Sequence, residues 1–174
     1  MPTQFCSQCG TRLIVGPIHG KEREHCPACG FVVFYNPAPV GLAVVAYDGQ
    51  LVLIRRTIPP LQGYWAPPAG HVEIGESVPE ATIREAQEET GLEIKLEGLI
   101  DVYSQADVKV VIIGYHGRAL GGALQAGDDA SDIALFPPGR LPAQPFPMDG
   151  TVMDRWFYDV IESVTASWRE APTP

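Results

Sequence analysis

Four cysteines near the start of the chain have the type and spacing of a metal site. They form two Cys-x-x-Cys pairs, Cys6 with Cys9 and Cys26 with Cys29, and a glycine follows each pair. Two such pairs can place four thiolates tetrahedrally around Zn²⁺, and the glycines allow the backbone to turn tightly around the sulfur atoms. Four protein ligands leave no open coordination position, so the pattern predicts a structural zinc site rather than a catalytic one.

Two alternatives to this zinc site are open. His19 and His25 lie in the same region and are possible substitute ligands, and the cysteines are otherwise four independent thiols. We favour metal ligation because the paired spacing is typical of a zinc ribbon. A ribbon of this size cannot fold by core burial alone, so the metal would supply folding free energy. We therefore predict a zinc ribbon over residues 1–35.

Glutamates are concentrated in residues 70–92, where Arg84 is the one arginine. Glu85, Glu88 and Glu89 stand at positions i, i+3 and i+4, which places them on one face of a helix. Like charges at this spacing destabilise a helix by about 0.2 to 0.5 kcal/mol per pair. The three carboxylates therefore indicate either a fully solvated face or a bound cation, and Mg²⁺ prefers such oxygen ligands.

The same segment contains a longer pattern of fixed positions. Gly70 is followed after five residues by Glu76, and after seven more by Arg84-Glu85-Ala86-Gln87-Glu88-Glu89-Thr90-Gly91-Leu92. This run matches every fixed position of the Nudix box, G-x5-E-x7-R-E-U-x-E-E-x-G-U, where U is apolar. The chain therefore resembles the Nudix hydrolases, and residues 65–70 resemble that family's loop into the motif. Many relatives have leucine where Pro67 stands.

The resemblance implies an α/β fold, the Nudix α/β/α sandwich, and hydrolysis of a nucleoside diphosphate linked to another group. The family's metal-ligand positions, for Mg²⁺ or Mn²⁺, fall on Gly70 through its carbonyl, Glu76, Glu85, Glu88 and Glu89. Glu85 and Glu89 correspond to the principal ligands, and Glu88 to a further ligand or a partner of Arg84. The cations would neutralise a pyrophosphate and lower the pKa of an attacking water. A chain of net charge −9 could then act on an anion.

The general base of the family comes either from the box or from a downstream loop. Residues 127–132 occupy that downstream position and offer only aspartates, so Asp129 or Asp132 is the candidate base. The alternative is a solvated acidic turn. Arg55 and Arg56 end a strand near the motif loop and are candidates to bind substrate phosphates, with ordinary surface charge as the alternative.

Three aromatic residues are candidates to stack on a nucleotide base. They are Tyr35, Trp65 and Tyr103. Core packing is the commoner role of an aromatic side chain and is the alternative for each of them.

Two groups of Nudix enzymes also carry a zinc ribbon, and they differ in the residues that follow the Nudix box or precede the Nudix domain. NADH pyrophosphatases carry S-Q-P-W-P-F-P-x-S after the box, where this chain has Ser104-Gln105-Ala106-Asp107-Val108-Lys109. The chain is more similar to plant ADP-ribose/FAD pyrophosphatases and their bacterial relatives, whose ribbon leads into the Nudix domain through a link like Phe34-Tyr35-Asn36-Pro37. The resemblance thus implies ADP-ribose or FAD as the substrate and AMP as one product. The alternatives are an NADH or NAD pyrophosphatase and a non-catalytic zinc-ribbon/Nudix binding module.

Composition narrows the class of protein and its partners. Of the 174 residues, 45% are hydrophobic and 19% are charged, as in folded globular proteins. The net charge of −9 argues against nucleic acid as a partner. The longest uncharged stretch, residues 31–47, is broken by prolines, so we expect no membrane span. Residues 1–5 show no secretory signal, so we expect a cytoplasmic protein with reduced cysteines. ADP-ribose-type relatives are often homodimers, so a homodimer is the expectation for this chain by analogy alone.

The elements that must position these residues can be predicted from their boundaries. We expect residues 36–39 to link the ribbon to a Nudix domain over residues 36–174. A helix is predicted over residues 77–90, with Ser77 and Glu80 as a capping box and Gly91 at its end. Strands are predicted at residues 41–47, 51–54, 94–96, 99–103, 108–115 and 133–136, with a turn at Asp48-Gly49. Residues 137–150 should form a loop and residues 152–168 a helix.

Overall fold

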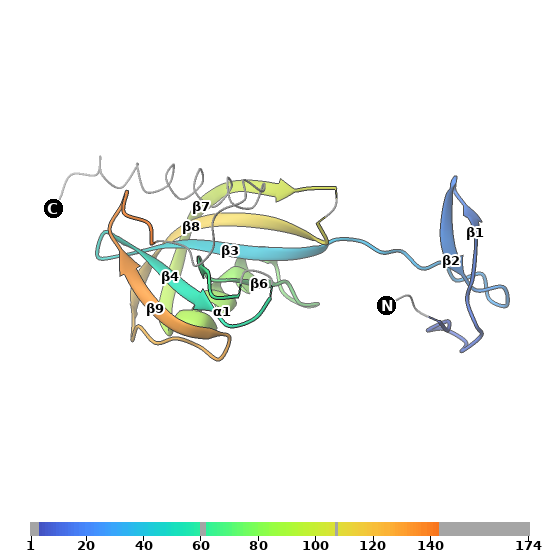
Figure 1. The fold of residues 1–174 in the computed structure, drawn as a ribbon, viewed down its shortest axis with the longest axis horizontal. Coiled ribbons are helices and arrows are strands. Elements are labelled where there is room, and N and C mark those ends of the chain that lie inside the picture. Colours follow the sequence, from blue (N-terminus) through green and yellow to red (C-terminus); the bar gives the residue numbers. More distant parts are fainter. Residues whose placement is uncertain (1–3, 60–61, 107, 143–174) are drawn as a thin grey trace. The chain divides into compact units, whose positions relative to one another are not determined.

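A computed structural model describes residues 4–59, 62–106 and 108–142. The chain divides into two compact units, Met1–Pro37 and Ala38–Pro174 (Figure 1). The predicted linker is shorter than expected, because Ala38 and Pro39 already belong to a strand. Ala38 donates its N–H to the carbonyl of Lys109 at 2.9 Å, and a proline is tolerated at the start of a strand.

The first unit contains a small antiparallel hairpin and the two cysteine loops. Strands β1 (Ile14–Ile18) and β2 (Lys21–His25) pair along their whole length. The turn between them places His19 and Gly20 at φ of 50° and 76°. Two positive φ values in succession are typical of the type I′ turn that closes two-residue hairpins.

The second unit is a mixed sheet of seven strands in the described residues, with the order β5-β4-β3-β8-β7, while β6 pairs with β3 and β9 with β4 (Figure 1). Its strands are β3 (Ala38–Tyr47), β4 (Gln50–Arg56), β5 (Trp65–Ala66), β6 (Ala69–His71), β7 (Leu92–Ser104), β8 (Val110–Gly122) and β9 (Ala130–Phe136). The β3–β8 pair is parallel and the other pairs are antiparallel. The predicted α/β class is confirmed.

Strand β7 differs from the prediction of two separate strands at residues 94–96 and 99–103. It is one continuous strand whose pairing with β8 shifts register three times, between Glu93 and Ile94, between Leu96 and Gly98, and between Leu99 and Asp101. Apolar and polar residues alternate from Leu92 to Glu97, and the run Gly98, Leu99 and Ile100 interrupts this alternation, which is why the pattern resembles two short strands.

Strands β3 and β4 form a fork. They pair only beside their turn, Ala46 with Leu51 and Tyr47 with Gln50. Asp48 and Gly49 occupy that turn with φ of 49° and 72°, which confirms the predicted hairpin. Beyond it, β6 pairs with β3 and β5 pairs with β4. The segment that precedes the helix therefore lies between the two diverging strands.

The helix α1 (Val78–Thr90) has the predicted ends. Ser77 is its N-cap and forms a capping box with Glu80, and Pro79 lies in the first turn. Gly91 ends the helix with a φ of 70°, and its N–H donates to the carbonyl of Gln87 at 2.8 Å. These contacts satisfy backbone groups that a helix end otherwise leaves unpaired.

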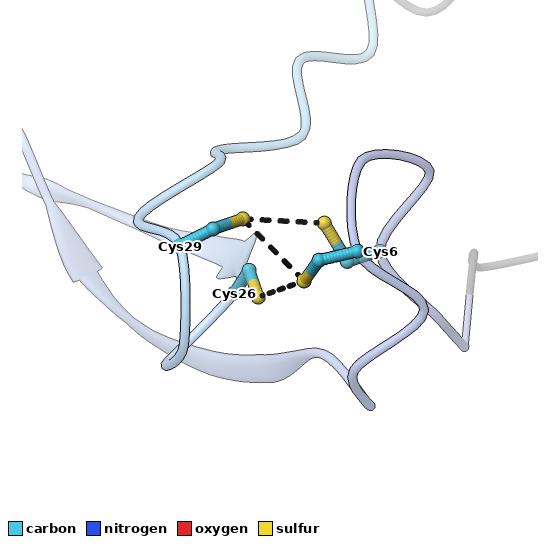
Figure 2. Close-up of side chains that lie close together, drawn as sticks. Cys6, Cys26 and Cys29 are labelled. Carbon is cyan, nitrogen blue, oxygen red and sulfur yellow. Dashed lines mark hydrogen bonds between the residues drawn. The ribbon is translucent and has the colours of Figure 1, made fainter.

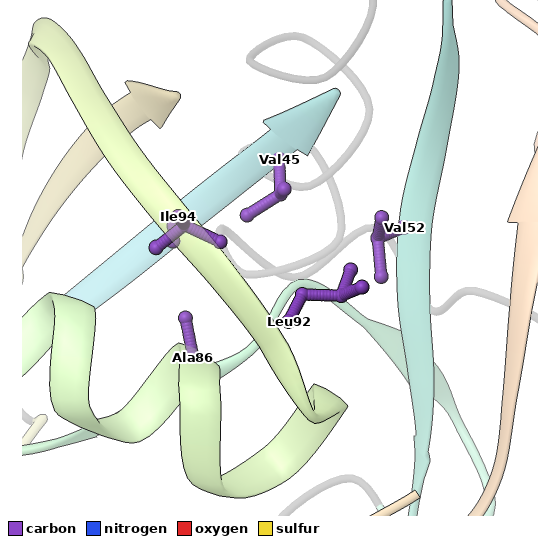
Figure 3. Packing of buried hydrophobic residues seen from close by; sticks show 6 residues of the cluster. Val45, Val52, Ala86, Leu92 and Ile94 are labelled. Carbon is purple, nitrogen blue, oxygen red and sulfur yellow. The ribbon is translucent and has the colours of Figure 1, made fainter. Parts of the chain in front are cut away.

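The sheet separates two apolar clusters, because successive residues of a strand face opposite sides. One cluster joins the helix to the sheet and consists of Ala43, Val45, Val52, Ala86, Leu92 and Ile94 (Figure 3). The cluster on the other face consists of Leu42, Val44, Leu51, Leu53 and Ile112. The helix is thus held on one face of the sheet by the burial of Ala86 against β3.

Two predicted elements lie wholly or partly beyond residue 142, where the described part of the chain ends. The helix predicted at residues 152–168 and most of the loop predicted at residues 137–150 lie outside the described residues. Within the described part of the chain, no helix has the length and apolar composition that a bilayer crossing needs.

Candidate functional site

Glu89 is the buried carboxylate of the helix, with 8% of its surface exposed. Its Oε2 atom accepts a hydrogen bond of 2.8 Å from the N–H of Ala69 in β6. Burial raises the pKa of Glu89 to about 7, the Ala69 N–H and the Arg56 charge oppose this rise, and the charges of Glu85 and Asp129 add to it. A cation beside this carboxylate would favour its ionised form.

Glu85 lies one turn earlier on the helix, against the neighbouring residue of β6. A Cβ atom on Gly70 would lie 1.9 Å from the carboxyl carbon of Glu85 and 2.2 Å from each of its oxygens. Only a residue without a side chain therefore leaves room for the Glu85 carboxylate at this position. Glu85 and Glu89 thus both lie against Ala69 and Gly70, where the β3–β4 fork places β6.

Arg84 organises the remaining carboxylates. It donates to Glu76 from Nη2 at 2.7 Å and from Nε at 3.0 Å, and to the carbonyl of His71 at 3.1 Å. Its Nη1 atom donates to Glu85 at 2.9 Å and to Glu88 at 3.1 Å. The hydrogen bonds from Arg84 lower the pKa of Glu76 to about 2, and this carboxylate stays ionised.

The three carboxylates predicted on one helix face have different surroundings. The side chain of Glu88 is 60% exposed, whereas that of Glu85 is 19% exposed and Glu89 is buried. Glu88 contacts Arg84, which agrees with one of its two predicted roles. The carboxylate of Glu80, on the first turn of the helix, accepts hydrogen bonds from Ser77.

Asp129 lies in the loop between β8 and β9, beside the end of the helix. Its carbonyl accepts hydrogen bonds from Thr57, at 3.0 Å from N and 2.8 Å from Oγ1. Two residues earlier, Gly127 donates its N–H to the carbonyl of Glu89 at 3.1 Å. The other candidate base, Asp132, pairs with Arg55 in the β4–β9 ladder. Its Oδ1 atom accepts from the N–H of Ile133 at 2.9 Å.

The two arginines at the end of β4 have different environments. Arg55 is exposed and donates from Nε to the carbonyl of Gly63 at 3.2 Å. Arg56 is half-buried, and its positive charge acts on Glu89. Of the two candidates for phosphate binding, Arg56 is therefore the one whose charge acts on Glu89.

Two of the candidate stacking residues pack against the core of the sheet. Trp65 packs edge-to-face against Phe136, with ring centroids 5.1 Å apart and an interplanar angle of 73°. Both Trp65 and Tyr103 are partly buried and pack against the cluster that contains Leu42. Tyr35 belongs to the other compact unit, where its hydroxyl donates to the carboxylate of Glu24.

The four cysteines meet at one point, and each pair uses the same backbone turn (Figure 2). Gly10 donates to the carbonyl of Cys6 at 2.9 Å, and Gly30 donates to that of Cys26 at 3.0 Å. Both glycines have positive φ, of 72° and 76°, which a residue with a side chain rarely adopts.

The four sulfur atoms are close enough together to hold one metal ion. The Sγ atoms of Cys9 and Cys26 are 3.4 Å apart, and those of Cys6 and Cys29 are 3.6 Å apart. All four lie within 4.8 Å of one another, and none forms a disulfide. Zinc–sulfur bonds of about 2.3 Å place ligand sulfurs roughly 3.8 Å apart. Among residues 4–59, 62–106 and 108–142, this is the one group of three or more possible ligands that is so closely gathered.

Several groups at the site could not be found from residue types. The N–H of Ala69 and the carbonyl of His71 are backbone groups, which every residue carries. Thr57 and Gly127 are separated in sequence from the motif and meet it only in the fold. The sequence offers one indication of the role of Gly127, namely that it directly precedes the acidic pair Asp128 and Asp129.

The comparisons with known proteins identify the family. Residues 37–157 match the model of the NUDIX domain, so the chain belongs to the Nudix family and is a Nudix hydrolase. Structural similarity agrees. The crystal structure of a NUDIX hydrolase from Nitrosomonas europaea superposes on 98% of this chain and 96% of its own with a TM-score of 0.84, at 24% identity, and shows the same fold.

Two relatives of known activity differ in how much of their length is matched. The ADP-ribose pyrophosphatase of Methanocaldococcus jannaschii is 37% identical over 130 residues, which cover 71% of this chain and 77% of that protein. The NAD-capped RNA hydrolase NudC of Stutzerimonas stutzeri is 30% identical over 148 residues, or 82% of this chain and 51% of the relative. The chain therefore spans about half the length of the NudC relative.

Proposed function

We propose that this Nudix hydrolase cleaves the pyrophosphate of a nucleoside diphosphate linked to another group, with ADP-ribose or FAD as the favoured substrate. The observation that carries the proposal is the pair Glu85 and Glu89, held against Ala69 and Gly70 at one place in the fold. The identity to an ADP-ribose pyrophosphatase supports the choice of substrate.

Mg²⁺ or Mn²⁺ is the proposed catalytic cofactor. The donor set is made of carboxylate and carbonyl oxygens, which suits these hard cations. Glu85, Glu89 and the carbonyl of Gly70 would hold the cation, with Glu76 as a supporting ligand and Glu88 as a further one. Bound there, it would neutralise pyrophosphate charge and lower the pKa of the attacking water.

The chain's own residues would have the following roles in catalysis. Arg84 holds Glu85 in place through its 2.9 Å hydrogen bond and keeps Glu76 ionised. Asp129, clamped beside the end of α1, is the proposed general base that takes a proton from water. Arg56 is the proposed phosphate-binding residue, with Arg55 beside it. Trp65 and Tyr35 remain predicted substrate contacts.

The proposal also covers the other parts of the chain. We place a structural Zn²⁺ on Cys6, Cys9, Cys26 and Cys29 in a ribbon over residues 1–35, and the hydrolase domain over residues 36–174. We propose a cytoplasmic protein that acts on a small molecule and binds neither nucleic acid nor membrane. A homodimer remains a prediction by analogy.

NADH or NAD pyrophosphatase is the second candidate, because the NudC relatives match 82% of this chain. The missing Pro-Trp-Pro-Phe-Pro run after Gln105 disfavours it. Without that run, recognition should depend on the ADP half and the pyrophosphate rather than on a reduced nicotinamide.

A hydrolysis panel tests the choice of substrate. ADP-ribose, FAD, NADH, NAD⁺, diadenosine polyphosphates and NAD-capped RNA are each incubated with the full chain and Mg²⁺ or Mn²⁺, and the products are separated by chromatography. The expected products are AMP with ribose 5-phosphate from ADP-ribose, and AMP with FMN from FAD. Reaction in ¹⁸O-labelled water identifies the phosphorus that water attacks. A higher kcat/KM for NADH or NAD-capped RNA than for both favoured substrates would contradict the proposal.

A further inference from the structure

Three of the segments that touch the helix α1 approach it most closely at a glycine. A Cβ atom on Gly41 of β3 would lie 2.1 Å from Oγ1 of Thr82, and one on Gly70 of β6 would lie 1.9 Å from the carboxyl carbon of Glu85. A Cβ atom on Gly127, in the loop after β8, would lie 2.3 Å from the carbonyl oxygen of Glu88. Gly41 and Gly127 lie outside the Nudix box.

The contact at Gly127 is the least able to adjust. Its hypothetical Cβ would also lie 3.1 Å from the Cα of Glu89, so the atoms in the way belong to the backbone of the helix. A rotating side chain could relieve a clash at Gly70, whereas a helix turn cannot move without breaking its own hydrogen bonds. Gly127 has no positive φ. Its requirement for glycine is therefore one of space, and not of backbone conformation.

The close approach allows the loop to bond to the end of the helix. Gln125 donates to the carbonyl of Thr90 at 2.9 Å, and Gly127 donates to that of Glu89 at 3.1 Å. These are carbonyls of the last turn, which have no partner within a helix. The loop thus replaces the water that would otherwise solvate the end of α1.

The same loop is fixed at its other end. Ala130 donates to the carbonyl of Gly127 at 3.1 Å, which closes a turn around Asp128 and Asp129. Thr57, directly after β4, donates twice to the carbonyl of Asp129. Asp129 is therefore clamped between the end of α1 and the end of β4.

We infer that Gly127 is a positioning residue of the active site, whose missing side chain lets the loop dock on α1 and hold Asp129 beside Glu89. The inference rests on the proposed function only for the roles of Glu89 and Asp129 at a cation-dependent site. With a methyl group at position 127 the loop must withdraw from the helix. Asp129 then leaves the neighbourhood of Glu89, and its negative charge no longer assists cation binding.

The test compares Gly127→Ala with Gly121→Ala in the full chain. Gly121 lies in β8, has no positive φ, and would place a Cβ atom in open space. Mn²⁺ affinity is measured by electron paramagnetic resonance titration without substrate, and kcat and KM are measured for ADP-ribose. We expect Gly127→Ala to weaken Mn²⁺ binding and lower kcat, each by about 10-fold, as for other residues that orient metal ligands. Gly121→Ala should match the parent.

A double variant shows whether Gly127 acts through Asp129. Asp129→Asn alone should weaken Mn²⁺ binding, and adding Gly127→Ala should cause little further loss, because coupled residues are not additive. Full additivity of the two losses would overturn the inference, and so would parent-like Mn²⁺ affinity in Gly127→Ala. If no tested substrate is hydrolysed, the proposed function fails, while Mn²⁺ binding still decides the role of Gly127.

A second variant covers the case in which Gly127→Ala does not fold. Thr57→Val keeps the shape of the side chain and the backbone N–H, and removes only the hydroxyl that donates to Asp129 at 2.8 Å. We expect it to weaken Mn²⁺ binding and lower kcat by a smaller factor than Gly127→Ala, of about 3-fold, because only one neutral hydrogen bond is lost and the bond from the Thr57 N–H remains. An unchanged Mn²⁺ affinity in a folded Thr57→Val would overturn the inference.

Discussion

Glu89 combines three conditions in the structure. It is buried, it accepts a hydrogen bond from a fixed backbone N–H, and it lies near the charges of Glu85 and Asp129. Burial and like charges both disfavour an ionised carboxylate, so the site holds negative charge at a cost. A divalent cation removes that cost. This is the physical link between the geometry of the helix and a metal-dependent hydrolase.

Glu89→Gln tests this link at a single residue. The amide keeps an oxygen that can accept from Ala69, so the fold should be retained, whereas the charge that we propose binds the cation is lost. We expect turnover of the favoured substrate at saturating Mg²⁺ to fall by more than about 100-fold, beyond the usual cost of losing a supporting group. Circular dichroism should remain unchanged.

The matched control is Glu93→Gln, which changes an exposed glutamate at the start of β7. It should leave turnover within a few-fold of the parent. If Glu89→Gln behaves like this control, the assignment of Glu89 to the cation is wrong.

Glu76→Gln tests the ion pair with Arg84 through its pH dependence. The folded-state pKa of Glu76 is lowered from 4.5 to about 2, so the pair stabilises the fold above about pH 4.5 and is lost as the pH falls through about 2. The variant should therefore unfold at lower urea concentration than the parent at pH 7, and this deficit should shrink as the pH is lowered toward 2. Urea unfolding at several pH values, without added Mg²⁺ or Mn²⁺, measures the difference. A deficit independent of pH would show that the carboxylate charge is not its cause.

At the scale of elements, the fork between β3 and β4 is the feature on which the site depends. Because the two strands pair only near Asp48 and Gly49, β5 and β6 can fill the space between them. That places Ala69 and Gly70 against α1, whose Ala86 anchors it to the sheet. The helix is further fixed at both ends, by Ser77 and by Gly91.

Ser77→Ala tests the capping box. The hydroxyl of Ser77 accepts from the N–H of Glu80, whose carboxylate in turn accepts from the N–H of Ser77 at 2.8 Å. Removing the hydroxyl leaves an N-terminal donor of the helix without this partner and should lower the free energy of unfolding by about 1 kcal/mol. Urea unfolding measures this change. Ser104→Ala, at the exposed end of β7, is the control and should lie within about 0.5 kcal/mol of the parent. A similar value for both variants would contradict the cap assignment.

At the scale of the whole molecule, the chain is two compact units joined at Pro37 and Ala38. The first unit buries two of its cysteines but leaves large side chains such as Phe5, Val15 and Phe34 exposed. So small a core does not by itself offset the entropy of ordering the chain, and we expect a metal bound by the four cysteines to supply the difference. The second unit has its own core on both faces of the sheet.

Cys26→Ser separates the roles of the two units. The variant should lose its zinc, measured by elemental analysis, and residues 1–35 should become sensitive to limited proteolysis because we expect the metal to supply their folding free energy. The hydrolytic rate per folded molecule should remain measurable, because the carboxylates proposed to bind the catalytic cation and to act as the base all lie in the second unit. Absence of zinc from the parent protein would contradict the ribbon assignment outright. Complete loss of hydrolysis in a variant with an intact second unit would show that the first unit takes part in catalysis.

Local features of the sequence predicted a large part of this protein. The capping box at Ser77, the turn at Asp48-Gly49 and the turn of each Cys-x-x-Cys pair are encoded within a few residues, and the structure contains all of them. The Nudix box likewise identified the family. Most of its fixed positions lie close together in sequence, on α1 and in the loop before it, so a linear pattern can record them. Such features depend on short-range geometry, which residue types specify directly.

Tertiary structure decided how these parts meet. Spacing alone treats Glu85, Glu88 and Glu89 as equivalent, and only the approach of β6 buries Glu89 while Glu88 stays exposed. The register shifts of β7 and the docking of Gly127 on the helix depend on contacts between segments far apart in the chain. The physical reason is that burial, pKa and clash distance are properties of neighbours in space. The sequence specifies which side chains the chain contains, and tertiary packing determines which of them lie together in one site.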